Sequence, residues 1–133
     1  MTTYPTMEEI MAEEMPLPKL FKDILKGWKK RFWKGWNTRP AEEKLQALTS
    51  LIQLLTCLEV NIKEGAKYRY FSDTQTIELD SQHPSLVSTL HEIGHHYYGG
   101  SELLACRFSV QLFKAVFPGS FKKLKVDGHR LTL

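Results

Sequence analysis

The residues with the clearest chemical potential in this sequence are His91, Glu92 and His95, which form a single H-E-x-x-H motif. On a helix, residues four apart lie on one face about one turn apart, so both imidazoles can reach one metal ion. Glu92 then lies beside them as a candidate general base for a metal-bound water. The motif predicts a zinc site with hydrolytic chemistry if this segment is helical.

A catalytic zinc ion usually has three protein ligands and one open position for water. Glu102 is the candidate third ligand, because it is the nearest downstream acid and follows Gly99-Gly100, where the chain can fold back. Otherwise, Glu102 is an exposed acid stabilised by the helix dipole. The alternative ligands are three histidines: His83, His96 and His129. Ligation by His96 together with its neighbour is difficult, because adjacent helical residues point about 100° apart.

The elements around the motif are those that such a site needs. Pro84 and Ser85 can begin a helix, and apolar residues follow at helical spacing until Gly99-Gly100 ends it. Ser101 can cap a second helix, which carries Glu102 near its start and stops at Pro118. The sequence thus predicts a buried metal helix followed by a second, ligand-bearing helix.

Upstream of the motif the hydrophobic period changes from helical to two. A wide apolar stripe of leucines after Pro40 predicts a core helix, and residues 59–63, 67–71 and 76–80 then alternate polar with apolar side chains. We expect an α+β fold with helices packed on a three-stranded antiparallel sheet. Asp127-Gly128, between two short β-type segments, predicts a C-terminal β-hairpin with its turn at that pair.

The net charge of +3 conceals an uneven distribution along the chain. Residues 1–18 carry four glutamates and no base, whereas residues 19–39 carry eight Lys or Arg and one Asp. The basic segment starts at Lys19, and its apolar residues recur at helical spacing as far as Trp36. We expect a basic amphipathic helix. Three interpretations of this helix are open. Its aromatic stripe packs on the domain and its lysines are solvated; or the helix binds nucleic acid or an acidic protein; or it lies on a membrane surface.

Other features set the class of the protein. Cys57 and Cys106 lie in apolar helical patterns, which favours buried free thiols over a disulfide. The chain has no apolar run long enough to span a bilayer and begins with polar and acidic residues, so we expect a cytoplasmic protein. A further hypothesis is that the acidic residues 7–15 form a short helix capped by Thr6 that docks on the basic helix or blocks the cleft.

These segments together resemble the ImmA/IrrE family of metallopeptidases. The resemblance covers residues 45–118 and rests on the strand at 76–80, the H-E-x-G-H-type sequence at 91–95, and Glu102-Leu103-Leu104-Ala105 followed by Phe108-Ser109. A metzincin is excluded, because Tyr98 and Ser101 stand where that motif needs Gly and His.

The resemblance implies that His91, His95 and Glu102 bind zinc and that Glu92 is the general base. It also implies that the edge of the strand ending at Asp80 pairs with an extended substrate. Cys106 stands where relatives often carry Asn or Asp in contact with a ligand. The connection between the two metal helices is also shorter than in many relatives.

The sequence therefore predicts a small zinc metallopeptidase of the gluzincin type, acting on a cytoplasmic protein such as a regulator. Within one domain, it consists of an acidic arm (1–18), a basic amphipathic helix (19–39) and a minimal zincin-like metallopeptidase domain (40–133). The candidates for the group that stabilises the oxyanion are Tyr68, Tyr70, Tyr97, Tyr98 and His96. The alternative function is a non-catalytic binding module that uses the basic aromatic helix, with a structural or vestigial zinc site.

Overall fold

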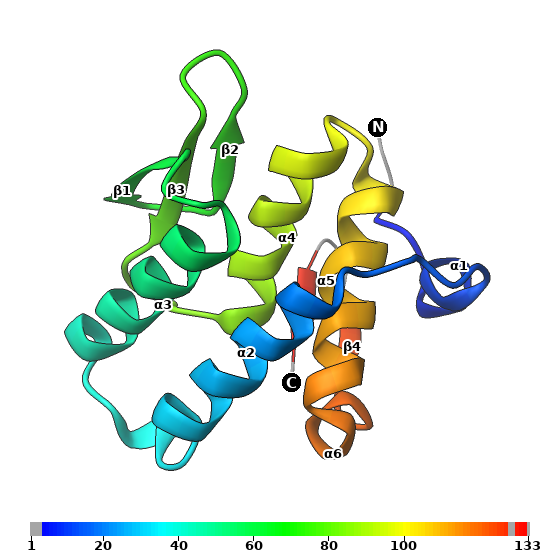
Figure 1. The fold of residues 1–133 in the computed structure, drawn as a ribbon, viewed down its shortest axis with the longest axis horizontal. Helices are drawn as coiled ribbons and strands as arrows, with labels where there is room; N and C mark the ends of the chain where they lie inside the picture. Colours follow the sequence, from blue (N-terminus) through cyan, green and yellow to red (C-terminus); the bar gives the residue numbers. More distant parts are fainter. Residues whose placement is uncertain (1–3, 128–129, 133) are drawn as a thin grey trace.

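The computed structural model describes residues 4–127 and 130–132 (Figure 1). Its helices are α1 (Met7–Met11), α2 (Lys19–Phe32), the 3-10 helix η1 (Trp36–Thr38), α3 (Ala41–Leu55), α4 (Leu86–Tyr98), α5 (Glu102–Val116) and α6 (Pro118–Phe121). Its strands are β1 (Asn61–Gly65), β2 (Arg69–Phe71), β3 (Thr76–Asp80), β4 (Lys125–Asp127) and β5 (Arg130–Thr132). The fold is of the α+β class, as the sequence predicts.

Helix α4 lies in the centre of the molecule, with the small sheet on one side and α5 on the other (Figure 1). Helix α2 crosses α5 and packs on α3, and α1 packs on the outer side of α5. The main core is made of buried apolar residues from α1, α2, α3, β3, α4 and α5. The acidic arm and the basic helix therefore share one core with the rest of the chain.

The three-stranded sheet is mixed, which corrects the expectation of an antiparallel meander. Its strand order is β1-β3-β2, with β1 parallel to β3 and β2 antiparallel to β3. Ile77, Glu78 and Leu79 on β3 are all buried, as befits a strand that is paired on both edges and covered by helices. Alternation of side chains predicted the strands themselves, but it carries no information about which strand lies between the other two.

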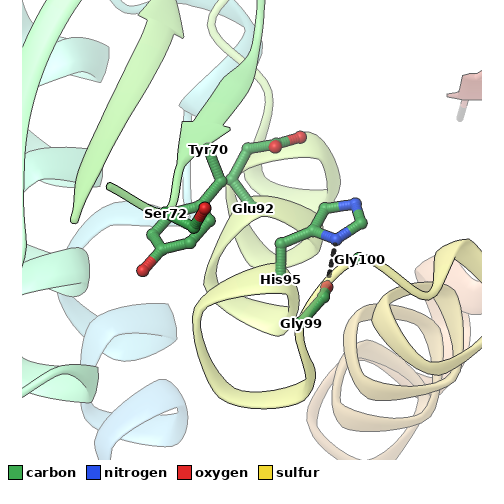
Figure 2. A pocket seen from close by; sticks show the side chains of 6 residues that line it. All are labelled: Tyr70, Ser72, Glu92, His95, Gly99 and Gly100. Atoms are coloured by element: carbon green, nitrogen blue, oxygen red, sulfur yellow. Dashed lines mark hydrogen bonds between the residues drawn. The ribbon is translucent and has the colours of Figure 1, made fainter. Parts of the chain in front are cut away.

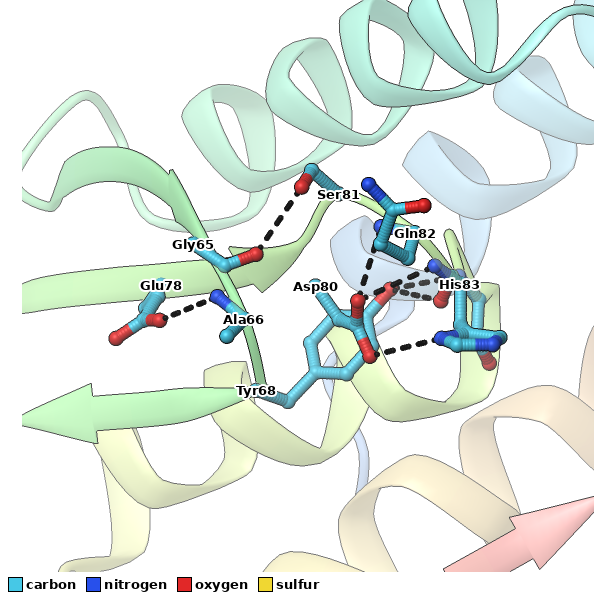
Figure 3. Close-up of polar contacts among 9 residues, drawn as sticks. Gly65, Ala66, Tyr68, Glu78, Asp80, Ser81, Gln82 and His83 are labelled. Atoms are coloured by element: carbon cyan, nitrogen blue, oxygen red, sulfur yellow. Dashed lines mark hydrogen bonds and ion pairs between the residues drawn. The ribbon is translucent and has the colours of Figure 1, made fainter.

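Because β3 is central, neither of its edges is free. The expectation that the strand ending at Asp80 offers its edge to a substrate is therefore wrong. Asp80 instead fixes the connection from β3 to α4: its carboxylate accepts hydrogen bonds from the backbone N–H groups of Gln82 and His83, at 3.0 and 3.2 Å (Figure 3). The Tyr68 hydroxyl also holds this connecting segment, because it donates a hydrogen bond to the His83 carbonyl at 3.1 Å.

The basic segment forms a shorter α-helix than predicted, because α2 ends at Phe32 and a left-handed Gly35 leads into η1. Trp28 and Trp36 are buried, and the Trp28 indole N–H donates to the Ala47 carbonyl at 2.9 Å. Lys26, Lys30, Arg31 and Lys34 are exposed. The aromatic stripe thus packs on the domain, the first of the three interpretations of this helix.

Both cysteines are free, as expected. Cys106 is buried on α5, but Cys57 is exposed, which corrects the prediction that both are buried. Cys57 lies just beyond the end of α3 with φ of 52°, so the helical pattern no longer applies to it.

The C-terminal β-hairpin is present as the antiparallel pair β4 and β5. Asp127 pairs with Arg130, so Asp127 belongs to β4 and not to the turn where the sequence placed it. Residues 128 and 129, including His129, lie outside the described residues. Among the described helices, none combines the length and apolar character needed to cross a membrane.

Candidate metal centre

The H-E-x-x-H motif lies on α4, whose start is well defined. The Ser85 hydroxyl caps this helix by accepting a hydrogen bond from the Ser88 N–H, and the Ser85 N–H donates to the Tyr68 hydroxyl at 2.7 Å. Leu90 and Ile93 are fully buried in the core, whereas His91 and His95 lie one turn apart toward α5. The helical context that the motif requires is therefore present.

The two histidines and Glu102 bring their ligand atoms to one point. Nε2 of His91 lies 3.1 Å from Nε2 of His95 and 3.3 Å from a Glu102 carboxylate oxygen, and the other Glu102 oxygen lies 2.7 Å from His95 Nε2. Ligand atoms around a tetrahedral ion with bonds of about 2.0–2.1 Å lie about 3.3 Å apart. These three residues could therefore hold one metal ion.

Each imidazole also has a hydrogen-bond partner for the nitrogen that faces away from this point. Nδ1 of His95 lies 2.7 Å from the Gly99 carbonyl oxygen, and Nδ1 of His91 lies 3.6 Å from Cys106 Sγ. When Nδ1 carries the proton, the Nε2 lone pair is free to bind metal, and histidine ligands usually have such a partner. Gly99 has φ of 76° and ψ of −150°, a conformation open essentially to glycine alone, and its carbonyl can thereby face His95.

The charges of the cluster are strongly coupled. Hydrogen bonds from His91 and His95 hold the pKa of Glu102 well below its usual range. Burial lowers the pKa of His91, but hydrogen bonds to Cys106 and Glu102 outweigh it and raise this pKa to about 10. The hydrogen bond to Glu102 likewise raises the pKa of His95. In the metal-free protein, the positive charge of the protonated imidazoles balances the negative charge of the Glu102 carboxylate. A bound metal ion would neutralise the same carboxylate.

Glu92 lies next to this cluster and lines a pocket of about 280 Å³ together with His95, Tyr70 and Ser72 (Figure 2). The Gly99-Gly100 turn forms the remaining wall. Burial raises the pKa of Glu92, an effect that the positive charges of His91 and His95 partly offset. A carboxylate with a raised pKa beside a metal site is suited to accept a proton near neutral pH.

The structure separates the five candidates for the group that would stabilise an oxyanion. Tyr70 lines the pocket with Glu92, and its hydroxyl is 2.9 Å from Nδ1 of His96. The Tyr68 hydroxyl bonds at the start of α4, and burial raises its pKa to about 12. Tyr97 donates to the Leu55 carbonyl, and Tyr98 packs against Phe108.

The alternative ligands do not join the cluster. His83 is exposed and pairs with Asp80 at 3.3 Å, at the far end of α4. His96 points toward Tyr70 and Glu59, as expected from its place next to His95 on the helix. Among the described residues, the one group with three metal-ligand side chains close enough to share an ion is His91, His95 and Glu102.

Two further residues lie near the cluster: Cys106 occupies the position where the family resemblance places a contact with a ligand, whereas Tyr4 was not identified from the sequence. Cys106 contacts His91 through Nδ1, and the Tyr4 ring stacks on His91 with ring centroids 6.0 Å apart. The position of Cys106 one turn after Glu102 was the available signal for its contact. The sequence contains no comparable signal for Tyr4, which precedes His91 by 87 positions.

Comparison of the chain with protein-family models, curated proteins and solved structures found no match.

Proposed function

We propose that this protein is a zinc-dependent metallopeptidase that hydrolyses peptide bonds in an exposed or unfolded segment of a protein substrate. The observation that carries the proposal is the convergence of His91, His95 and Glu102 beside a pocket lined by Glu92. A cluster that served folding alone would not require an additional buried glutamate at the wall of a pocket, because burying a carboxyl group is costly. The sequence resemblance to ImmA/IrrE metallopeptidases supports the same proposal.

The donor set favours zinc among the common metal ions. Two imidazole nitrogens and one carboxylate form the ligand set of several hydrolytic zinc enzymes, and they leave a fourth position open. When bound there, zinc would polarise the scissile carbonyl and lower the pKa of a water molecule. The hydrogen bonds of the two Nδ1 atoms support this assignment, because they orient both imidazoles for binding through Nε2.

Residues of the chain then carry out proton transfer and stabilisation of the oxyanion. Glu92 accepts a proton from the attacking water and later delivers it to the nitrogen of the leaving amine. Tyr70 is our candidate for donating a hydrogen bond to the oxyanion, because it lines the same pocket as Glu92. Its contact with His96 would hold the phenol in place between turnovers.

The substrate would enter along β2 rather than β3. β2 is an edge strand of the sheet, and Tyr70 on this strand and Ser72 just beyond it line the pocket. An extended segment of substrate could therefore pair with the backbone of β2 and bring its scissile bond to Glu92. By resemblance to the family, we propose that the substrate is a regulatory protein.

The alternative of a non-catalytic module that stacks bases on the basic helix is less favoured. Trp28 and Trp36 are buried in the core and unavailable for stacking. The exposed lysines of α2 can still attract a polyanion, but such attraction is compatible with a peptidase.

The test compares the wild-type protein with Glu92→Gln, with zinc content and cleavage of fluorescently labelled casein as the two measurements. Glu92→Gln keeps the size of the side chain but cannot accept a proton. We expect it to retain one zinc ion per chain and to lose cleavage by about 10²- to 10⁴-fold. Glu64→Gln, at an exposed position on β1, is the matched control and should cleave at the wild-type rate.

Two results would contradict the proposal in different ways. Equal cleavage by wild type and Glu92→Gln would remove Glu92 from the mechanism. A wild-type protein that acquires no zinc from a stoichiometric zinc solution would overturn the metallopeptidase itself.

A further inference from the structure

The N-terminal arm, residues 4–18, is fastened to α5 next to the metal centre (Figure 1). Its short helix α1 begins with a capping box, in which the Thr6 hydroxyl accepts from the Glu9 N–H and the Glu9 carboxylate accepts from the Thr6 N–H. Ile10 is completely buried in the main core. The arm is therefore a folded part of the domain, not a loose extension.

Two polar side chains of α5 hold the arm in place. The Gln111 amide accepts from the Met15 N–H at 2.7 Å and donates to the carbonyls of Ile10 and Glu13 at 3.0 and 2.8 Å. Arg107 donates to the Glu9 carbonyl at 3.1 Å and pairs with the Glu13 carboxylate at 3.5 Å. The arm thus docks on α5, not on the basic helix as its charge had suggested.

This anchorage brings Tyr4 to the metal ligand His91. The two rings are stacked, with an interplanar angle of 29°. Burial, with Cys106 close by, raises the pKa of the Tyr4 hydroxyl. Cys106 Sγ in turn lies 3.6 Å from Nδ1 of His91. The pocket is lined by residues of β2, α4 and the two turns that follow them, so Tyr4 covers His91 without occupying the pocket.

We propose that the N-terminal arm is part of the metal centre and that Tyr4 is a positioning residue for His91. Sulfur is a weak hydrogen-bond acceptor and a thiol rotates freely, so Cys106 alone is a poor support for a metal-ligating histidine. The Tyr4 ring stacks on the His91 imidazole and limits its rotation, which keeps Nδ1 facing the sulfur. His95 needs no such help, because a backbone carbonyl receives its Nδ1 proton.

The inference rests on metal binding, the first part of the proposed function, and is tested by metal binding rather than by cleavage. The full-length protein is stripped with a chelator and titrated with zinc against a chromophoric competitor. Cobalt(II) is used in parallel, because its absorption spectrum reports ligand geometry. The variants are Tyr4→Ala, Tyr4→Phe and, as the matched control on the exposed side of the same arm, Glu8→Ala.

We expect Tyr4→Ala to weaken zinc affinity by about 10- to 100-fold and to alter the cobalt spectrum, since loss of a partner of a metal ligand has effects of this size. Tyr4→Phe retains the ring and should keep a zinc affinity close to that of the wild type. Glu8→Ala should match the wild type. Urea unfolding of each metal-free variant checks that the fold is intact.

Each outcome decides a separate question. Tyr4→Ala with wild-type zinc affinity and an unchanged cobalt spectrum would overturn the role of the arm but leave the metallopeptidase proposal standing. If Tyr4→Ala fails to fold, Tyr4→Leu, which fills space without an aromatic ring, replaces it, and unchanged zinc affinity and cobalt spectrum for that variant would overturn the role of the Tyr4 ring. A wild-type protein that binds neither ion would overturn both proposals.

Discussion

At the scale of single residues, His91, His95 and Glu102 form a candidate metal centre whose charges can be balanced by protons or by a metal ion. The pKa of Glu102 is depressed by its hydrogen bonds from the histidines, so its contribution to stability is present above its unfolded pKa and is lost as the pH falls. Burial opposes protonation of His91, but its partners raise its pKa to about 10. The contribution of His91 is therefore fully present below its unfolded pKa of about 6.5 and is lost as the pH rises toward 10.

We expect the metal-free protein to lose stability between about pH 6.5 and 10. One proton held by His91 in the folded state corresponds to a decrease of up to about 1.4 kcal/mol per pH unit in the free energy of unfolding. His91→Gln should show a smaller decrease over the same range. Urea unfolding of chelator-treated protein measures both, and a wild-type stability that rises with pH would contradict the assignment.

At the scale of elements, the geometry of the site depends on how closely α4 approaches α5. A Cβ placed on Gly94 would lie 3.0 Å from both Cα and the carbonyl oxygen of Ala105. Gly94 is one residue before His95, and Ala105 lies one turn after Glu102, so the contact sets the distance between the ligands of the two helices. Glycine is needed here to allow this approach, and the motif thus contains a packing residue as well as candidate ligands.

We expect Gly94→Ala to destabilise the metal-free protein by about 1–3 kcal/mol and to weaken zinc binding, because the added methyl group pushes the two helices apart. Gly27→Ala is the matched control. Gly27 is exposed within α2, and a Cβ added there would meet no atom within 4 Å, so this change should be neutral or stabilising by up to about 1 kcal/mol. Urea unfolding and zinc titration of both variants provide the comparison; equal behaviour would show that the helices tolerate the methyl group.

At the scale of the whole molecule, opposite charges are held on separate elements. The acidic arm packs on α5 through Arg107 and Gln111, while Lys26, Lys30 and Lys34 lie exposed along the basic segment. The aromatic residues of that segment are mainly used for packing. A polyanion would therefore contact the exposed lysines of this surface but not the indoles of Trp28 and Trp36, which are buried.

We expect the protein to bind a labelled DNA duplex at about 20 mM salt and to release it steeply as the salt concentration rises, because phosphate contacts dominate such binding. A triple variant in which Lys26, Lys30 and Lys34 are each replaced by Glu should bind the duplex more weakly. The tryptophan emission of the wild-type protein should not shift when DNA is added. Fluorescence anisotropy and emission spectra measure the two effects. Absence of binding at low salt would exclude this surface as a nucleic-acid site, and a shift in emission would show that the indoles take part.

The sequence alone determined the elements that carry the site, because their signals are local. A motif at helical spacing, a cap at Ser85 and a glycine turn before Glu102 predicted α4, α5 and the three side chains that come together as candidate ligands. Alternation of side chains likewise predicted three strands.

Only the tertiary structure decided how distant segments meet. The position of β3 between β1 and β2 depends on backbone hydrogen bonds between strands, which the side-chain pattern of one strand does not encode. The contact of Tyr4 with His91 depends on Ile10 being buried and on Gln111 receiving an arm that lies about 100 positions earlier in the chain. Tyr70 came to line the same pocket as Glu92 for the same physical reason: local periodicity specifies which face of an element is apolar, whereas packing between elements specifies what that face touches.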